Sequence, residues 1–263
     1  MSLSVIDSPN EIVSQSPYTH LINADCFDVF PHIPDGSVDM ILADLPYGTT
    51  ACKWDSILPF DKLWDAYKRI IKPNGAIALT ASQPFTSALV MSNPKDFRYS
   101  LVWDKVGTTG FQLAKIMPLR RHEDICVFYR RKPKYVPSME IRGKIRKKGG
   151  SKADNGCYGD LRSVESFSNE YYPTSIIQIS NASKSGLMHP TQKPVALFEY
   201  LIKTYTNEGD LVLDNTAGVF TTCVAAHNTN RHSIGIEKEA DYYQKGLGRF
   251  DKIISNLSTH HVP

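Results

Sequence analysis

The segment Asp44-Leu45-Pro46-Tyr47 has the composition of a turn that could activate an amine. The exocyclic amine of a nucleobase is a poor nucleophile because its lone pair is delocalised into the ring, and two hydrogen-bond acceptors can localise that lone pair. The Asp44 carboxylate and a backbone carbonyl of Leu45 or Pro46 could supply these acceptors, and Tyr47 could stack on the base. A paired base would have to leave its duplex to reach such a pocket. An ordinary polar turn capped by an aromatic residue is the alternative for these four residues alone.

A second segment, residues 214–222, has the features of a cofactor-binding loop. It lies between a short apolar run and a helical pattern, and it holds Asp214, Thr216 and Gly218; glycine lets a backbone approach a ligand closely. About twenty residues further on, the apolar run 233–236 ends at Glu237, which is placed to accept hydrogen bonds from both ribose hydroxyls of an adenosine cofactor. A structural aspartate and a surface glutamate are the alternatives.

A third polar segment, His189-Pro190-Thr191-Gln192-Lys193-Pro194, leads into a helical pattern. Thr191 and Lys193 could hold a carboxylate, such as the methionine end of a cofactor. Pro194 suits the first turn of a helix, so a plain helix cap is the alternative.

Alternating periodicities predict the elements that carry these turns. Strand patterns cover residues 20–24, 38–43, 76–80, 99–104, 124–129, 211–213 and 233–236, and helical patterns cover residues 60–71, 82–91, 194–205, 221–228 and 240–254. Such alternation favours a mostly parallel sheet covered by helices, in which ligands bind beyond the carboxyl ends of the strands. Pro73-Asn74-Gly75 is expected to separate a helix from the next strand, and residues 1–17 are expected to form a loose leader.

Composition indicates a globular protein without a membrane span. Of 263 residues, 41% are hydrophobic and 22% are charged, and no apolar run reaches the roughly 18 residues that a span requires. The first residues lack the pattern of a signal peptide, so we expect a cytoplasmic protein. The five cysteines form no C-x-x-C pair, which argues against a disulfide framework and a zinc site.

A basic block lies between residues 130 and 152, where ten Lys and Arg accompany one acid, while the whole chain has a net charge of +3. This asymmetry favours a polyanionic partner, and a solvated surface loop is the alternative. The candidate contacts are Arg130, Arg131, Lys132, Lys134, Arg142, Lys144, Arg146, Lys147 and Lys148.

Taken together, these segments resemble the amino-methyltransferases of DNA in their permuted β arrangement. In that family an Asp/Asn/Ser-Pro-Pro-Tyr turn comes first, a target-recognition insert follows, and an Asp-Pro-Phe-x-Gly-Ser-Gly-Thr-Thr cofactor loop lies near the C-terminus. Residues 44–47 resemble the catalytic turn, residues 189–194 the segment before the cofactor strand, and residues 214–222 the cofactor loop. Asn23-Ala24-Asp25-Cys26 resembles the family's Gly-Asp-Cys turn, whose Asp lies at the adenosine end of the cofactor.

The resemblance implies a Rossmann-like α/β fold, with a seven-stranded methyltransferase sheet, helices on both faces and a less regular insert. Residues 18–131 and 187–263 would form the catalytic domain, and residues 132–186 the target-recognition insert. The implied reaction is transfer of a methyl group from S-adenosylmethionine to the N6 amine of a flipped adenine in DNA, as in restriction-modification enzymes of bacteria or phages. Asp25, Asp214, Thr216, Gly218, Glu237, His189, Thr191 and Lys193 would bind the cofactor. No metal and no membrane are implied, and a homodimer is left open.

Several residues depart from the family pattern. Leu45 replaces the first Pro of the catalytic turn, and Val219 and Phe220 replace Ser-Gly in the cofactor loop. We expect Phe220 to crowd the methionine end of the cofactor or to weaken its binding, so a weakly active or inactive DNA-binding module stays an alternative. Leading Asp rather than Ser favours adenine N6; cytosine N4 and an amine of RNA are the other candidate targets.

Overall fold

The structure is a computed structural model that describes residues 12–16, 19–50, 52, 55–149, 152–153, 161–162, 165–181 and 192–258. The chain divides into two compact units. The first, here called the main unit, comprises Met1–Val136 and Ser175–Pro263, and the second, the small unit, comprises Pro137–Thr174. The small unit lies within residues 132–186, the stretch that the sequence predicts to be an insert. Among the described residues, no helix is long and apolar enough to cross a membrane.

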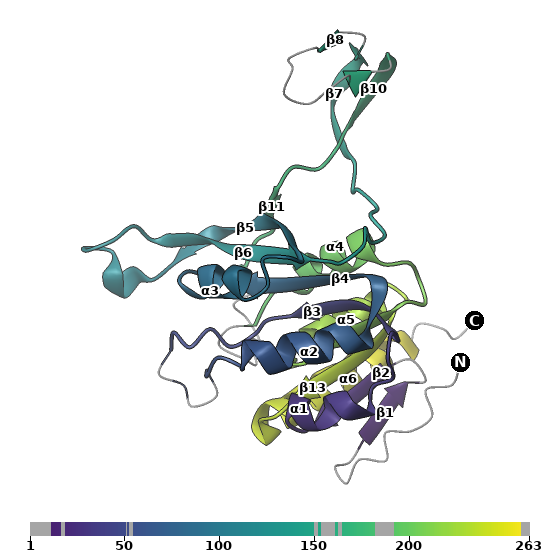
Figure 1. Cartoon of the computed structure of the whole chain (residues 1–263). Helices are drawn as coiled ribbons and strands as arrows, with labels where there is room; N and C mark the ends of the chain where they lie inside the picture. The colour runs from purple at the N-terminus through teal and green to yellow at the C-terminus, as the bar shows by residue number, and fades with distance from the viewer. Residues whose placement is uncertain are drawn as a thin grey trace. The chain divides into compact units, whose positions relative to one another are not determined.

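The main unit is built on a sheet of nine strands among the described residues, in the order β1-β2-β13-β12-β3-β4-β6-β5-β11 (Figure 1). The strands are β1 (Ile12–Ser16), β2 (Thr19–Asn23), β3 (Val38–Ala43), β4 (Ile71–Ala81), β5 (Phe97–Thr109), β6 (Arg120–Phe128), β11 (Ile176–Gln178), β12 (Leu211–Asp214) and β13 (His232–Glu237). The helices are α1 (Cys26–Val29), α2 (Phe60–Ile70), α3 (Phe85–Ser92), α4 (Val195–Tyr205), α5 (Thr221–Asn228) and α6 (Ala240–Ser258), with 3-10 turns at Phe30–His32 and Phe111–Leu113.

Strand direction follows the predicted parallel pattern over most of the sheet. β2, β13, β12, β3 and β4 pair in parallel, and β6 lies antiparallel between β4 and β5. These seven strands confirm the predicted methyltransferase sheet. Two edge strands extend it: β11 pairs with β5, and β1 pairs with β2 within the expected loose leader. The β-branched pair Ile12-Val13 favours this edge strand, which the Ser- and Pro-rich composition around it concealed.

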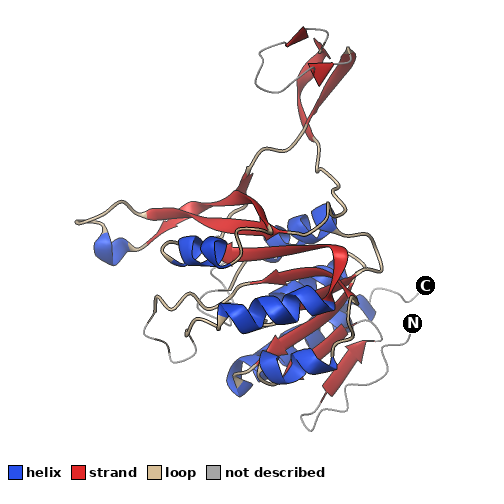
Figure 2. Ribbon diagram, viewed as in Figure 1, coloured by secondary structure: helices blue, strands red, loops and turns tan. Residues whose placement is uncertain are grey.

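The core lies on both faces of the sheet because the central strands are apolar on both sides. In β3, Ile41 and Ala43 pack with the α2 side chains Leu63 and Tyr67 on one face. Met40 and Leu42, on the other face of β3, pack with residues of α4 and α5. Figure 2 shows the helices on either side of the strands. Because successive residues of β3 are buried on opposite faces, the register of this strand is fixed. The position of Asp44, which directly follows β3, is fixed with it.

The predicted break at Pro73-Asn74-Gly75 is wrong, because β4 runs through these residues. Its pairing with β3 shifts register between Val38 and Met40, which accommodates the irregular segment. A Cβ on Gly75 would lie 2.8 Å from the carbonyl oxygen of Asp39. Gly75 therefore permits the close approach of β3 and β4 and does not interrupt β4.

The C-terminal helix α6 packs through a cluster that contains Leu21, Phe220, Tyr243 and Phe250. Phe220 has a φ of 58° at the N-terminus of α5, and its side chain is fully buried. A Cβ added to Gly246 of α6 would lie 2.4 Å from the Phe220 ring. The absence of a side chain at Gly246 thus makes room for the phenyl ring.

We predict that Gly246→Ala destabilises the fold by about 1–3 kcal/mol, because the new methyl group overlaps a ring that has no free space. Gly248→Ala is the matched control, since its Cβ would meet nothing within 4 Å in the same helix. The control should be neutral or gain up to about 1 kcal/mol from higher helix propensity. Urea unfolding of both variants measures the difference, and equal free energies of unfolding would contradict the packing argument.

The small unit consists of short antiparallel ladders. β7 (Glu140–Lys148) pairs with β10 (Ser166–Tyr171), and β8 (Lys152–Ala153) pairs with β9 (Leu161–Arg162). This part of the predicted insert is thus more regular than the sequence indicates. Charged residues dominate β7 and leave Ile141 and Ile145 largely exposed, so the hairpin lacks the apolar alternation that identifies strands.

Candidate active site

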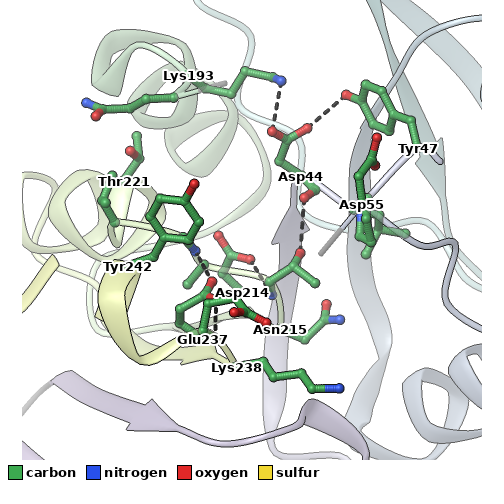
Figure 3. A pocket seen from close by; sticks show the side chains of 18 of the residues that line it. Asp44, Tyr47, Asp55, Lys193, Asp214, Asn215, Thr221, Glu237, Lys238 and Tyr242 are labelled. Atoms are coloured by element: carbon green, nitrogen blue, oxygen red, sulfur yellow. Dashed lines mark hydrogen bonds and ion pairs between the residues drawn. The ribbon is translucent and has the colours of Figure 1, made fainter. Parts of the chain in front are cut away.

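The carboxyl ends of β3 and β12 meet at one cavity. The two strands are neighbours in the sheet, with Leu213 opposite Ile41, so the turns that follow them emerge side by side. The Thr216 hydroxyl of one turn donates a hydrogen bond of 3.1 Å to the carbonyl oxygen of Asp44 in the other. Both turns line a cavity of about 450 Å³, a volume in the usual range for small-molecule sites. Figure 3 shows the side chains of both turns in this cavity.

The Asp44 carboxylate lies at the centre of a hydrogen-bond network. Its Oδ1 accepts hydrogen bonds from the hydroxyls of Tyr47, at 2.8 Å, and Thr80 of β4. Its Oδ2 accepts one from the Lys193 ammonium at 2.8 Å (Figure 3). The carboxylate is therefore held in one orientation, and its side chain still exposes 22% of its surface.

The other residues of the turn 44–47 have distinct surroundings. Leu45, which replaces the first proline of the family pattern, is buried in the core. The Tyr47 ring stacks on Phe85 with 5.1 Å between ring centroids. Burial and the nearby Asp44 raise the pKa of Tyr47 well above its usual value, so this hydroxyl stays protonated and donates. Pro46, between Leu45 and Tyr47 in the chain, lines the cavity.

A buried chain of charges extends from Asp44 to the neighbouring strands. Lys193 Nζ lies 3.1 Å from Glu123 Oε2 of β6, and Glu123 Oε1 lies 3.2 Å from Lys105 Nζ of β5. Burial alone would lower the pKa of Lys193, but Asp44 and Glu123 raise it well above its usual value. Lys193 thus stays cationic and faces the Asp44 carboxylate. The sequence predicts instead that it holds the carboxylate of a cofactor.

On the other side of the cavity, the loop after β12 is held by its own side chains. Asp214 is buried and accepts hydrogen bonds from the Thr216 amide, at 3.1 Å, and from the Thr222 hydroxyl. Burial raises the pKa of Asp214 to about 7. The Asn215 side chain accepts a hydrogen bond from Tyr67 of α2. Asp214 therefore shapes the loop, and its contact with any ligand stays a prediction.

Glu237, at the end of β13, also turns its carboxylate toward this loop. Its Oε2 accepts a hydrogen bond of 2.7 Å from the Gly218 amide, and its Oε1 accepts one of 2.7 Å from Glu239. Gly218 has a φ of 56°, a conformation that favours glycine. Asp25 caps α1 through the Phe27 amide and lies on the same cavity wall. Each carboxylate oxygen keeps a lone pair for a hydroxyl group, so these acids fit the ribose and base end of an adenosine cofactor.

The expectation that Phe220 crowds the cofactor is wrong. Its left-handed backbone turns the ring away from the cavity and into the cluster around Tyr243, 5.8 Å between ring centroids. Val219, its neighbour, does line the cavity. Phe220 thus contributes to core packing and does not line the cavity.

A further acid, Asp55, organises the loop that follows the catalytic turn. Its carboxylate accepts hydrogen bonds from three successive backbone amides, those of Gly48 at 2.8 Å, Thr49 at 2.9 Å and Thr50 at 2.7 Å. Burial would raise the pKa of Asp55, but hydrogen bonds from the Thr50 side chain and from these amides lower it. Sequence reasoning missed this residue. A local signal in the sequence is Gly48, because glycine is typical of tight turns. In the structure this residue has a positive φ.

The structure does not bring all the predicted residues into one place. His189 and Thr191 lie outside the described residues. Of the basic candidates, Arg130, Arg131, Lys132 and Lys134 belong to the main unit and are exposed. Those of the small unit lie on β7, where Arg142, Lys144, Arg146 and Lys147 are exposed and Lys148 is half-buried. Within the described part of the chain, no group of three or more His, Cys, Asp or Glu is arranged to hold a metal ion.

A family model and proteins named as methyltransferases align with most of this chain. A family model described as DNA methylase (N6_N4_Mtase) matches residues 38–247. The type II methyltransferase M.HpaI of Haemophilus parainfluenzae is 27% identical over 88% of this chain and 74% of its own length. The type II methyltransferase M.BglII of Bacillus subtilis is 26% identical over 90% of this chain and 71% of its own length.

Solved structures show the same fold. The cytosine-N4-specific PvuII DNA methyltransferase superimposes with a TM-score of 0.64 over 91% of this chain and 90% of its own, at 16% identity. The M1.HpyAVI–SAM complex has a TM-score of 0.58, at 24% identity, over 86% of this chain and 97% of its own. The family match covers both residues 44–47 and residues 214–222. The chain therefore belongs to the N6_N4_Mtase family of S-adenosylmethionine-dependent DNA methylases.

Proposed function

We propose that this protein methylates the N6 amine of adenine in DNA, with Asp44 as the residue that activates the amine. The observation that carries the proposal is the position of the Asp44 carboxylate, which lies in the same cavity as the cofactor loop and is oriented by three side-chain donors. This arrangement supplies a fixed acceptor beside a site for the methyl donor, and fixed acceptors cost no reorganisation during the reaction.

The number of acceptor sites on Asp44 supports this role. A carboxylate offers about four lone-pair sites, and the hydroxyls of Tyr47 and Thr80 and the ammonium of Lys193 occupy three of them. The remaining site can accept one hydrogen of the target amine. A carbonyl of Leu45 or Pro46 would accept the other hydrogen, and the lone pair on nitrogen would then point toward the methyl donor.

The chain's own residues position the two reactants. When bound, S-adenosylmethionine supplies an electrophilic methyl group on a sulfonium sulfur. Glu237 and Asp25 would bind its adenosine end, and the loop that contains Thr216 and Gly218 would hold it near Asp44. Tyr47, which already stacks on Phe85, would present its edge or its other face to the base. Lys193 would orient Asp44 and keep the carboxylate within hydrogen-bond reach of the amine.

Adenine is favoured over cytosine by the leading acid of the turn. The first residue of the turn is Asp44, whereas a resemblance to cytosine-N4 enzymes would predict Ser at this position. The fold alone does not separate the two bases, because the PvuII enzyme, which superimposes well, is cytosine-N4-specific. We also propose that the exposed basic residues of 130–134 and of β7 bind DNA phosphates, each contact adding about 0.9 to the salt slope of the affinity.

Incubation with mixed-sequence duplex DNA and labelled S-adenosylmethionine, followed by mass analysis of the nucleosides, tests the base assignment. We expect the label in N6-methyldeoxyadenosine and none in other nucleosides. A competing single-stranded RNA should not reduce incorporation. Label in N4-methylcytosine would reassign the target base within the same family, and preferential labelling of RNA would contradict DNA as the substrate.

A further inference from the structure

The hairpin between β5 and β6 ends in a tip that exposes large apolar side chains to solvent. Every residue of 111–118 is exposed. Phe111 exposes 65% of its surface and Ile116 exposes 77%, with Leu113 and Met117 beside them. Exposed apolar side chains that follow one another closely in this way are typical of a contact site.

The tip is an ordered structure. Phe111–Leu113 forms a 3-10 turn, and the amides of Ile116 and Met117 donate to the carbonyl of Leu113 at 3.0 Å. Next to the tip, Arg121 of β6 forms a two-pronged ion pair with Asp104 of β5, at 2.8 and 2.9 Å. The apolar side chains are therefore presented on a hydrogen-bonded support, as an element that must enter a partner requires.

The hairpin is continuous with the active-site cavity. Trp103, Lys105 and Thr109 of β5 and Glu123 of β6 all line that cavity. Phe111 follows Thr109 by two residues, which span at most about 7 Å of extended chain. Figure 1 shows the hairpin extending past the end of β4, on the side where β3 ends. A DNA duplex that places a base in the cavity must therefore pass close to the tip.

The charge of the hairpin fits DNA. No acidic residue occurs between positions 105 and 122, whereas Lys115, Arg120 and Arg121 lie in or beside the tip. Lys115 and Arg120 are exposed. Apolar side chains flanked by cations match the two features of a distorted duplex, namely opened base steps and adjacent phosphates. A partner protein with an acidic apolar surface would match the charges but would compete with DNA for the approach to the cavity.

We propose that the hairpin tip, residues 110–119, is a DNA wedge: its apolar side chains enter between base steps next to the target base and occupy the space that the extruded base leaves. The inference rests on the proposed function only in requiring methyl transfer to DNA, and it holds for either target base. It assigns the work of opening the duplex to the tip, in contrast to the phosphate contacts proposed for the basic residues of 130–134 and β7.

The test compares the double variant Phe111→Ser/Ile116→Ser with Met91→Ser, which also removes an exposed apolar side chain, one that exposes 71% of its surface on α3. The sequence that the wild type methylates is first mapped on its DNA product. The substrates are two duplexes that contain this sequence, one fully paired and one with a mismatch at the target base. We expect the double variant to lose about tenfold or more in kcat/KM on the paired duplex and at most about twofold on the mismatched one, because a mismatch lowers the cost of extrusion. Met91→Ser should match the wild type on both.

Three outcomes would overturn the proposal. Equal losses on the two duplexes would show that the tip does not assist extrusion, and wild-type activity on both would show that it is not used. A change of oligomeric mass in light scattering, for the double variant alone, would show that the tip binds a second copy of the chain. Methylation of cytosine by the wild type would alter the base assignment and leave this comparison intact.

The flanking cations give an independent readout. If Lys115 and Arg120 contact phosphates, Lys115→Gln and Arg120→Gln should each reduce the slope of log affinity against log salt by about 0.9 on a paired duplex. Unchanged slopes in both variants would contradict the placement of DNA along the hairpin.

Discussion

Replacement of Asp44 by alanine is expected to reduce methyl transfer by about 10³-fold or more while leaving the affinity for S-adenosylmethionine within about twofold of the wild type. The variant removes the fixed acceptor for the amine, but the backbone carbonyl of Asp44, which accepts the Thr216 hydroxyl, stays in place. The cofactor loop should therefore keep its shape. Single-turnover incorporation of labelled methyl measures the first quantity, and isothermal calorimetry measures the second.

Two further variants make the Asp44 result specific. Asp44→Asn keeps the size of the side chain and one oxygen acceptor but loses the charge, so its rate should fall between those of the wild type and Asp44→Ala. Asp61→Ala removes an exposed acid in the first turn of α2 and should leave the rate unchanged. Equal turnover by Asp44→Ala and the wild type would remove Asp44 from the mechanism, and no heat of cofactor binding by the wild type would favour a non-catalytic DNA-binding module.

The convergence of Asp44 and Asp214 could be predicted from sequence because it depends on local patterns and one general rule. Each residue directly follows an apolar run of strand length, and turns at the carboxyl ends of neighbouring parallel strands share one edge. The helical pattern of residues 60–71 likewise predicted α2, whose buried face includes Leu63, Tyr67 and Ile70. Periodicity carries this information because each residue's exposure follows from its own element.

The other partners of Asp44 could not be predicted in this way. Glu123 reaches the site because β6 lies antiparallel between β4 and β5, where it pairs with Trp103, and Thr80 reaches it from β4. Strand order is a property of the whole sheet, and nothing in the local sequence around Glu123 indicates its neighbours. The orientation of Phe220 was also hidden, since it depends on a positive φ and on space that two distant glycines, Gly235 and Gly246, provide.

The second large effect is expected at Lys193. We predict that Lys193→Met lowers kcat by about 100-fold or more, because Asp44 loses the donor that orients it and faces Glu123 without an intervening cation. The fold should lose about 3–5 kcal/mol, the usual cost of removing one partner of a buried ion pair. Steady-state kinetics and chemical unfolding measure the two effects.

Lys105→Met is the matched control for Lys193→Met. Lys105 is also a buried lysine, its side chain exposes only 5% of its surface, and it pairs with the same residue, Glu123. Its ammonium group bonds Glu123 and Thr109, whereas that of Lys193 also bonds Asp44. Both variants remove one positive charge from the same chain of groups, so both should destabilise the fold by similar amounts. A loss of kcat confined to Lys193→Met would then report on the orientation of Asp44, since a purely structural role would affect both variants alike.

The kinetic pattern also separates two roles for Lys193. A residue that binds the cofactor's carboxylate should mainly raise the KM for S-adenosylmethionine when it is removed, whereas one that orients Asp44 should mainly lower kcat. The ordinary pKa of lysine is 10.5, and Asp44 and Glu123 raise that of Lys193 further. Its contribution to stability is therefore fully present below about pH 10 and is lost only as the pH rises through the raised value. The stability difference between the wild type and Lys193→Met should thus stay constant across the neutral range, and a difference that changes there would assign the effect to another titrating group.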